Sequence, residues 1–234
     1  MIEDTPFPPP LPEPPSTTPA PGALPWEDPS VGRFEALFRT IGMFTTRPDD
    51  AFSKLAPAGL GRPFVYALIM AWVELAAGMA YWAAAQSPFM LIGFPELRDQ
   101  LAEAAVGTGV MVAIGVGLFV LMPLFVVIGL AIHTCILHLM LLIVGEGRGG
   151  FETTARVICY SHTADLANLV PLCGGLLSLV WFAALQIIGV ARAHQCSYGK
   201  AALAVILPVL LCCSCLAITL LFFGAALYGA LAGR

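Results

Sequence analysis

The chain has few charged residues for its length. Lys, Arg, Asp and Glu make up 11% of its 234 residues, and hydrophobic residues make up 59%. Ordinary soluble domains carry about 25% charged and about 45–50% apolar residues. The apolar runs are long and do not alternate with polar residues, as barrel strands would. Because lipid cannot satisfy exposed backbone polar groups, the spanning elements must then be helices. The sequence predicts an all-α, polytopic membrane helix bundle.

Motifs of known enzymes are also lacking. The sequence contains no phosphate-binding loop, no Gly-x-Ser-x-Gly and no His-Glu-x-x-His. The glycine-rich stretch at 145–150 follows an apolar helical run rather than a strand, which indicates a turn. No basic patch points to nucleic acid. We therefore predict a protein that is not an enzyme and has no cofactor and no nucleic-acid partner.

A secretory signal is missing from the first residues, which read Met-Ile-Glu-Asp without a basic or an apolar region. The first spanning helix is therefore expected to direct insertion. Residues 1–30 are rich in proline, which favours extended, solvated backbone. We predict a disordered tail, and binding of this tail to an SH3- or WW-like groove remains the alternative.

Cysteines are present in an odd number and mostly inside apolar runs, so no disulfide framework is indicated. The seven are Cys135, Cys159, Cys173, Cys196, Cys212, Cys213 and Cys215. Buried free cysteine behaves as a small apolar residue. The group at 212–215 lacks a second ligand pair at zinc-finger spacing. We predict no metal site there.

Residues 31–62 have amphipathic character. Phe34, Leu37, Phe38, Ile41 and Phe44 recur at spacings of three and four, which places them on one face of a helix. A second short helix is expected from the Pro-Asp-Asp sequence at 48–50, because proline and acidic residues favour a first turn. Both segments are too short and too polar to span. They predict helices lying at the membrane surface.

Five membrane helices are expected in the domain 63–231, at about 63–85, 105–144, 155–170, 176–191 and 201–231. The second run, 40 residues long, would extend about 60 Å as one helix, roughly twice the hydrocarbon thickness. It is either one helix kinked at Pro123 or a hairpin near that residue, and we favour the helix. The less apolar run at 155–170 is expected inside the bundle.

Orientation is predicted from Lys and Arg, which concentrate on the cytoplasmic side. With the N-terminus in the cytoplasm and five crossings, nine basic residues lie inside and two outside. The inside set is Arg33, Arg39, Arg47, Lys54, Arg62, Arg148, Arg156, Arg192 and Lys200, and the outside set is Arg98 and Arg234. The C-terminus is therefore expected outside.

Polar and ionisable residues within the predicted spans are the candidate functional residues, since such groups are costly in a bilayer. The candidate buried polar track consists of Glu74, His138, Tyr160, His162, Asp165 and Asn168. It would serve an ion, a proton or a lipid headgroup, or it would be a hydrogen-bond network that only fixes packing. A metal site formed by His138, His162 and Asp165 is a further possibility. His133 and His138 do not share a helix face.

Several short motifs follow one another along the apolar region. Phe44-Thr-Thr-Arg-Pro-Asp-Asp-Ala-Phe52 is followed by His138-Leu-x-Leu-Leu-x-Val-Gly145 and by Phe151-Glu-Thr-Thr-Ala-Arg-Val-Ile-Cys-Tyr-Ser161. Val170-Pro171 with Gly174, Val180-Trp181, Gln186-Ile-Ile-Gly189, Ala193-His194 and Lys200-Ala-Ala complete the order. In these motifs the chain resembles the Yip domain family, the Yip-one-like, Ypt/Rab-interacting membrane proteins, over about residues 34–231.

The resemblance implies a five-span fold with a cytosolic N-terminus. Eukaryotic members of the family are linked to Rab GTPases and vesicle trafficking, whereas the role of prokaryotic members is undefined. The short tail and compact core are similar to a bacterial member, so the cytoplasmic membrane is the expected location. The expected function is to organise the membrane or recruit partners, with the bilayer, other membrane proteins or a second copy as partners. The alternative is a small ion, proton or lipid transporter or channel that uses the polar track.

Overall fold

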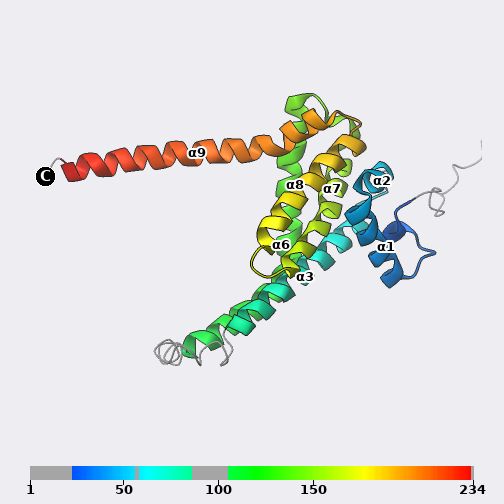
Figure 1. Ribbon diagram of the computed structural model, residues 1–234, viewed down its shortest axis with the longest axis horizontal. Helices are drawn as coiled ribbons and strands as arrows, with labels where there is room; N and C mark the ends of the chain where they lie inside the picture. Colours follow the sequence, from blue (N-terminus) through cyan, green and yellow to red (C-terminus); the bar gives the residue numbers. More distant parts are fainter. Residues whose placement is uncertain (1–22, 56–57, 86–104, 233–234) are drawn as a thin grey trace, which may run out of the picture.

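The computed structural model describes residues 23–55, 58–85 and 105–232, and within these ranges it is entirely helical (Figure 1). The surface helices are η1 (Pro25–Glu27), α1 (Arg33–Thr46) and α2 (Pro48–Ser53). The remaining elements are α3 (Gly61–Ala85), α6 (Ala105–Val144), η2 (Gly147–Gly149), α7 (Gly150–Ser161), η3 (His162–Leu169), α8 (Gly174–Ala193) and α9 (Tyr198–Ala232). The predicted all-α membrane bundle is confirmed.

Four of these helices are long and apolar enough to cross a membrane, within the described part of the chain. Their candidate spans are Gly61–Tyr81, Gly115–Val144, Gly174–Ala193 and Tyr198–Phe223. The run predicted at 155–170 instead forms α7 and the 3₁₀ helix η3 in succession. This segment carries too many polar residues to face lipid, and its side chains from Thr153 to Ser161 are all buried.

The helix α6 is one continuous helix that contains Pro123, rather than a hairpin. It changes direction along its length, with its first part beside α3 and its last part beside α7 (Figure 1). A proline inside a helix removes one backbone hydrogen bond and commonly produces such a bend. Neighbouring apolar side chains such as Leu124 and Phe125 are half exposed, as expected for a surface that faces lipid.

An aromatic cluster joins the surface helices to the bundle. Phe44 of α1 lies 4.8 Å from the ring of Phe52 in α2 and stacks on Tyr160 of α7 at 5.1 Å. Tyr66 of α3 contacts Tyr160 at 5.2 Å, and all four side chains are fully buried. Aromatic pairs at these separations add to the free energy gained from their burial. The surface helices are thus a fixed part of the fold.

The segment 23–30 differs from the disordered tail predicted to extend through residue 30. Leu24 is 0% and Trp26 is 6% exposed, and both pack into the core. The indole Nε1 of Trp26 donates to the carbonyl oxygen of Arg62 at 2.7 Å, and its backbone N–H donates to the Oγ1 of Thr40 at 3.0 Å. These contacts attach a proline-rich stretch to the bundle. The rest of the predicted tail, 1–22, lies outside the described residues.

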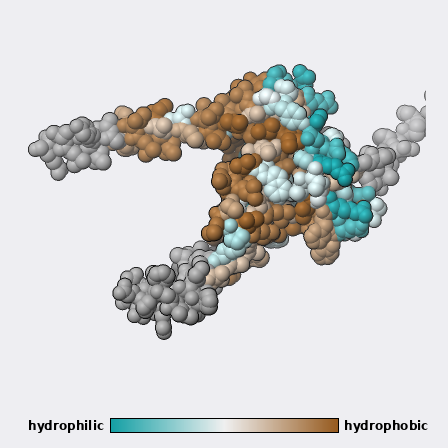
Figure 2. Space-filling view, in the orientation of Figure 1, coloured by the Kyte–Doolittle hydropathy of each residue, from teal (hydrophilic) through white to brown (hydrophobic). Residues whose placement is uncertain are grey.

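The surface of the molecule is divided by hydropathy. Hydrophilic residues gather on the side that carries α1 and α2 and at the adjoining helical turns, while the remaining described helices are mostly hydrophobic, with smaller polar patches (Figure 2). The last helix, α9, extends away from the bundle, and Leu216, Leu221 and Phe223 are 60%, 73% and 67% exposed. A helix that is apolar on all sides is suited to contact with lipid.

Candidate functional site

A cavity of about 640 Å³ lies among α3, α6, η3 and α8. Its residues from α3, α6 and α8 all belong to candidate membrane spans. The residues that line it are Ala71, Glu74, Met122, Phe125, Val126, Gly129, Leu130, His133, His162, Asp165, Asn168, Gly175, Ser178, Leu179 and Phe182. It thus has a polar side made by Glu74 and η3 and an apolar side made by α6 and α8. We call this space the polar cavity.

The 3₁₀ form of η3 aligns its three polar residues. A 3₁₀ helix has three residues per turn, so side chains at i and i+3 lie directly above one another. His162, Asp165 and Asn168 follow at this spacing and all line the polar cavity. In an α-helix the same spacing would rotate each successive residue by about 60° around the axis, so Asn168 would lie about 120° away from His162. The unusually long 3₁₀ segment therefore gives the cavity its polar wall.

Two hydrogen bonds orient these groups. The Nδ1 atom of His162 lies 2.7 Å from the Oδ2 atom of Asp165, and the Nδ2 amide of Asn168 donates to the Oε1 atom of Glu74 at 2.9 Å. The first pair lies within η3, and the second connects η3 to α3. Asp165 is buried, whereas Glu74 is exposed. The carboxylate of Glu74 is therefore held at the mouth of the cavity and that of Asp165 at its base.

A further hydrogen-bonded pair lies on the α6 side of the polar cavity, and the predicted track did not include it. The Nε2 amide of Gln186 donates to the Nε2 atom of His133 at 3.1 Å, so the proton of this neutral imidazole sits on Nδ1. His133 also lines the polar cavity. The sequence marks both residues as polar groups in apolar helices. Only the folded structure shows that the two side chains meet.

A second, smaller cavity of about 290 Å³ adjoins the first. Its lining includes Glu74, Asn168 and Gly175, which also line the polar cavity, and it continues past Tyr81 to Leu172 in the turn between η3 and α8. The hydroxyl of Tyr81 donates to the carbonyl oxygen of Leu169 beside it. The two spaces share Glu74 and Asn168, so they lie on either side of this hydrogen-bonded pair.

Close backbone packing holds η3 against α8. A Cβ atom at Gly174 would lie 2.6 Å from the carbonyl oxygen of Ala167 and 3.0 Å from the Cα atom of Asn168. Contacts of that length do not occur for real Cβ atoms, so the start of α8 requires glycine at this position. The absence of a side chain thus lets η3 lie directly on α8 and fixes the polar wall of the cavity.

His138 does not lie in the polar cavity. Its Nδ1 atom is 3.0 Å from the Oγ1 atom of Thr154, which in turn lies 3.1 Å from the Nε2 atom of His194. The Nδ1 atom of His194 accepts from the backbone N–H of Gly149 at 3.1 Å, so its proton is on Nε2. Burial lowers the pKa of His194 to about 4, which keeps the ring neutral. This network ties the α6–α7 turn to the end of α8.

Tyr160 is also separate from the polar cavity. Its hydroxyl donates to the Oε1 atom of Glu27 at 2.5 Å, and the Nη2 atom of Arg156 donates to both carboxylate oxygens of Glu27 at 2.5 and 2.7 Å. The Nη1 atom of Arg156 donates to the carbonyl oxygen of Gly59 at 2.8 Å. We call Glu27, Arg156 and Tyr160 the N-terminal anchor. No pattern in the sequence indicates that Glu27, which lies in the proline-rich segment, pairs with Arg156 and Tyr160.

Of the six candidate residues, the structure thus brings four together: Glu74, His162, Asp165 and Asn168. The possible metal site that combined His138 with His162 and Asp165 is not formed. Within the described ranges, no group of three or more His, Cys, Asp or Glu side chains is placed to hold a metal ion. The polar cavity is suited instead to a ligand bound by hydrogen bonds and charge.

The helical fold and the apolar spans define a multi-pass helical membrane protein. The Yip1 domain model matches residues 41–230, and the chain belongs to the Yip1 domain family. The resemblance found in the sequence is thereby confirmed. Members of this family are generally membrane proteins without enzymatic activity. No curated protein and no solved structure matches the chain at a significant level.

Proposed function

We propose that this protein organises the membrane in which it sits, through the helical surface made by α1. The observation that supports the proposal is a pair of outward-facing aromatic side chains: Phe34 is 81% and Phe38 is 69% exposed. They lie one helical turn apart, beside the basic residues Arg33 and Arg39. Aromatic and basic side chains on one helix are typical of helices that lie in the boundary between headgroups and acyl chains.

The opposite face of α1 is fixed to the bundle. Ala36, Thr40 and Phe44 are buried on that side. A second connection runs from α2, where Asp49 accepts a hydrogen bond from the Nε atom of Arg192 at 2.7 Å and another from the hydroxyl of Tyr198. These donors hold the pKa of Asp49 below its usual value. Because α1 and α2 are attached to the bundle in this way, insertion of Phe34 and Phe38 into lipid would also displace the spanning helices.

Placement of the N-terminus and α1 in the cytoplasm follows from the excess of basic residues on that side, and we propose the bacterial cytoplasmic membrane as the location. The outer leaflet would then contact the turn between η3 and α8. In that orientation α1 meets the inner leaflet, whose anionic lipids attract Arg33, while Arg39 is paired with Glu35.

Replacing both Phe34 and Phe38 by serine should weaken the effect of the protein on vesicle shape. The full chain is reconstituted in liposomes that contain anionic lipid, at increasing protein density, and vesicle diameter is measured by electron cryomicroscopy. Because both rings are exposed, the substitutions should change the free energy of unfolding by no more than ordinary surface substitutions do, about 0.5 kcal/mol. Thermal unfolding checks this. We expect wild type to narrow the size distribution and the double variant to lose most of that effect.

The matched control replaces Leu37, which is half-buried on the inner side, by isoleucine and should behave as wild type. Equal vesicle shapes for wild type, the double variant and protein-free liposomes would contradict the proposal.

A second candidate function is transport of an ion, a proton or a lipid, and the polar cavity is the observation that favours it. Reconstituted liposomes loaded with a pH- or ion-sensitive dye measure flux for wild type, Asp165→Asn and His162→Ala. Flux that both substitutions abolish would assign the protein to transport. Absence of flux in wild type, with the fold intact, would remove this candidate and leave the organising role.

A further inference from the structure

We propose that the polar cavity binds the ammonium headgroup of an amphiphile, with the apolar part of the ligand lying along α6 and α8 toward lipid. This site is independent of the role proposed for α1. It rests on the charge of the polar wall, on the free oxygens of its carboxylates and on the apolar wall that faces them.

The ionic character of the cavity is acidic. Glu74 and Asp165 are its two carboxylates, and neither the polar cavity nor the adjoining smaller one has a Lys or Arg among its lining residues. The two imidazoles, His133 and His162, already share hydrogen bonds with Gln186 and Asp165. An anionic headgroup would therefore meet carboxylates without a compensating cation. A positively charged group would meet complementary charge.

Each carboxylate offers one oxygen to a ligand. Oε1 of Glu74 accepts from Asn168, and Oδ2 of Asp165 is paired with His162. Among the described residues nothing donates to Oε2 of Glu74 or to Oδ1 of Asp165. An ammonium group has several N–H donors and no acceptor, so it can satisfy both oxygens at once. Glu74 is exposed at the mouth and Asp165 is buried at the base, which leaves the group between them.

The opposite wall selects an amphiphile over a simple cation. Met122 and Phe125 of α6 and Leu179 and Phe182 of α8 line it. Phe125 is 50% and Leu179 is 65% exposed, so the wall continues to the outer surface of the spanning helices. A hydrated metal ion gains nothing from such a wall, and no cluster of metal ligands is present in the described ranges. An alkyl chain gains hydrophobic free energy there in proportion to its buried area.

Binding is tested on the full chain in neutral maltoside micelles. The probe is dodecylammonium, and dodecanol and dodecyl sulfate have the same chain with a neutral or an anionic head. Thermal unfolding measures how far each probe shifts the unfolding midpoint, and native mass spectrometry counts the bound probe molecules. The variants are Glu74→Gln and Asp165→Asn, which keep side-chain shape and remove charge. The matched control is Glu35→Gln, an exposed carboxylate paired with Arg39 on α1.

Of the three probes, we expect only dodecylammonium to raise the unfolding midpoint of wild type and of Glu35→Gln. Its affinity should fall roughly tenfold or more in each cavity variant, because a charge-assisted hydrogen bond is lost. Two variants keep the test decisive if one does not fold. The proposal would be overturned by a response to dodecanol equal to that to dodecylammonium, or by a response of both cavity variants equal to that of wild type. The same shift with sodium ions, or no response of wild type at all, would also overturn it.

Discussion

Replacing Arg156 by methionine should lower the free energy of unfolding by about 3–5 kcal/mol, the cost of removing one partner of a buried ion pair. Arg156 is 1% exposed, and the side chain of Glu27 is 12% exposed. Methionine preserves much of the side-chain volume, so the loss comes from the charge. The carboxylate of Glu27 would keep only the hydroxyl of Tyr160 as a donor in the N-terminal anchor.

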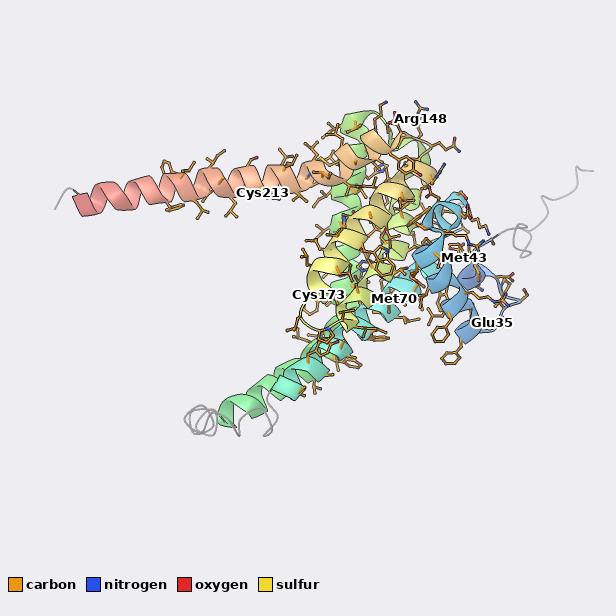
Figure 3. All side chains as sticks on the ribbon, viewed as in Figure 1. Glu35, Met43, Met70, Arg148, Cys173 and Cys213 are labelled. Atoms are coloured by element: carbon orange, nitrogen blue, oxygen red, sulfur yellow. The ribbon has the colours of Figure 1, made fainter. Side chains whose placement is uncertain are left out.

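Loss of Arg156 should also change the structure near Trp26, in addition to lowering the stability of the whole fold. Glu27 follows Trp26, whose ring lies 6.1 Å from that of Tyr66 and fills a core position. An unpaired carboxylate that turns toward water would withdraw this ring from the core. Figure 3 shows the labelled side chains of Glu35 and Met43 on α1 and Met70 on α3, the two helices between which η1 is held. Loss of the anchor should therefore loosen the contact between α1 and the bundle.

Unfolding of the full chain in mixed micelles, followed by tryptophan fluorescence, measures the effect. The control combines Arg156→Met with Glu27→Gln, which removes both charges. Replacement of both members of a buried ion pair is often nearly neutral, so the double variant should recover most of the stability. A double variant as unstable as the single one would show that packing of Arg156, rather than its charge, supports the fold.

Most of the helical architecture follows from periodicity and apolar length in the sequence. Long apolar runs define α3, α6, α8 and α9, because the length of a bilayer-spanning helix is fixed by the membrane itself. The preference for one helix through Pro123 over a hairpin also agrees with the structure. The position of the N-terminal segment could not be predicted this way. It depends on long-range partners of Trp26 and Glu27, and proline content alone gave the opposite expectation.

The candidate site was predicted in part. His162 and Asp165 are three residues apart in the sequence, a spacing that indicates a common helix face, and the structure pairs their side chains. Asn168 joins that face because the segment is a 3₁₀ helix, which a period of 3.6 residues does not indicate. His138 and Tyr160 were grouped with these residues on polarity alone. Their directions are set by packing against Thr154 and Glu27, which no local pattern reveals.

Replacing Gly189 by alanine should lower the free energy of unfolding by about 1–3 kcal/mol, the usual cost of overpacking a core. A Cβ atom at this position of α8 would lie 2.6 Å from Cγ1 of Val157 and 2.8 Å from Cε1 of Phe52. Both neighbours are fully buried, so neither can move aside without displacing others. The methyl group would therefore separate α8 from α7 and α2 and strain the aromatic cluster beneath α1.

The matched control is the same substitution at Gly117 in α6, where a Cβ atom would meet nothing within 4 Å. Alanine there should stabilise by about 0.5–1 kcal/mol, since glycine loses more backbone freedom than alanine on forming a helix. Unfolding of both variants in mixed micelles gives the comparison. The two changes should have opposite signs, because helix propensity is the same and only the surroundings differ. Equal stabilisation in both would mean that α8 does not pack this closely on α2 and α7.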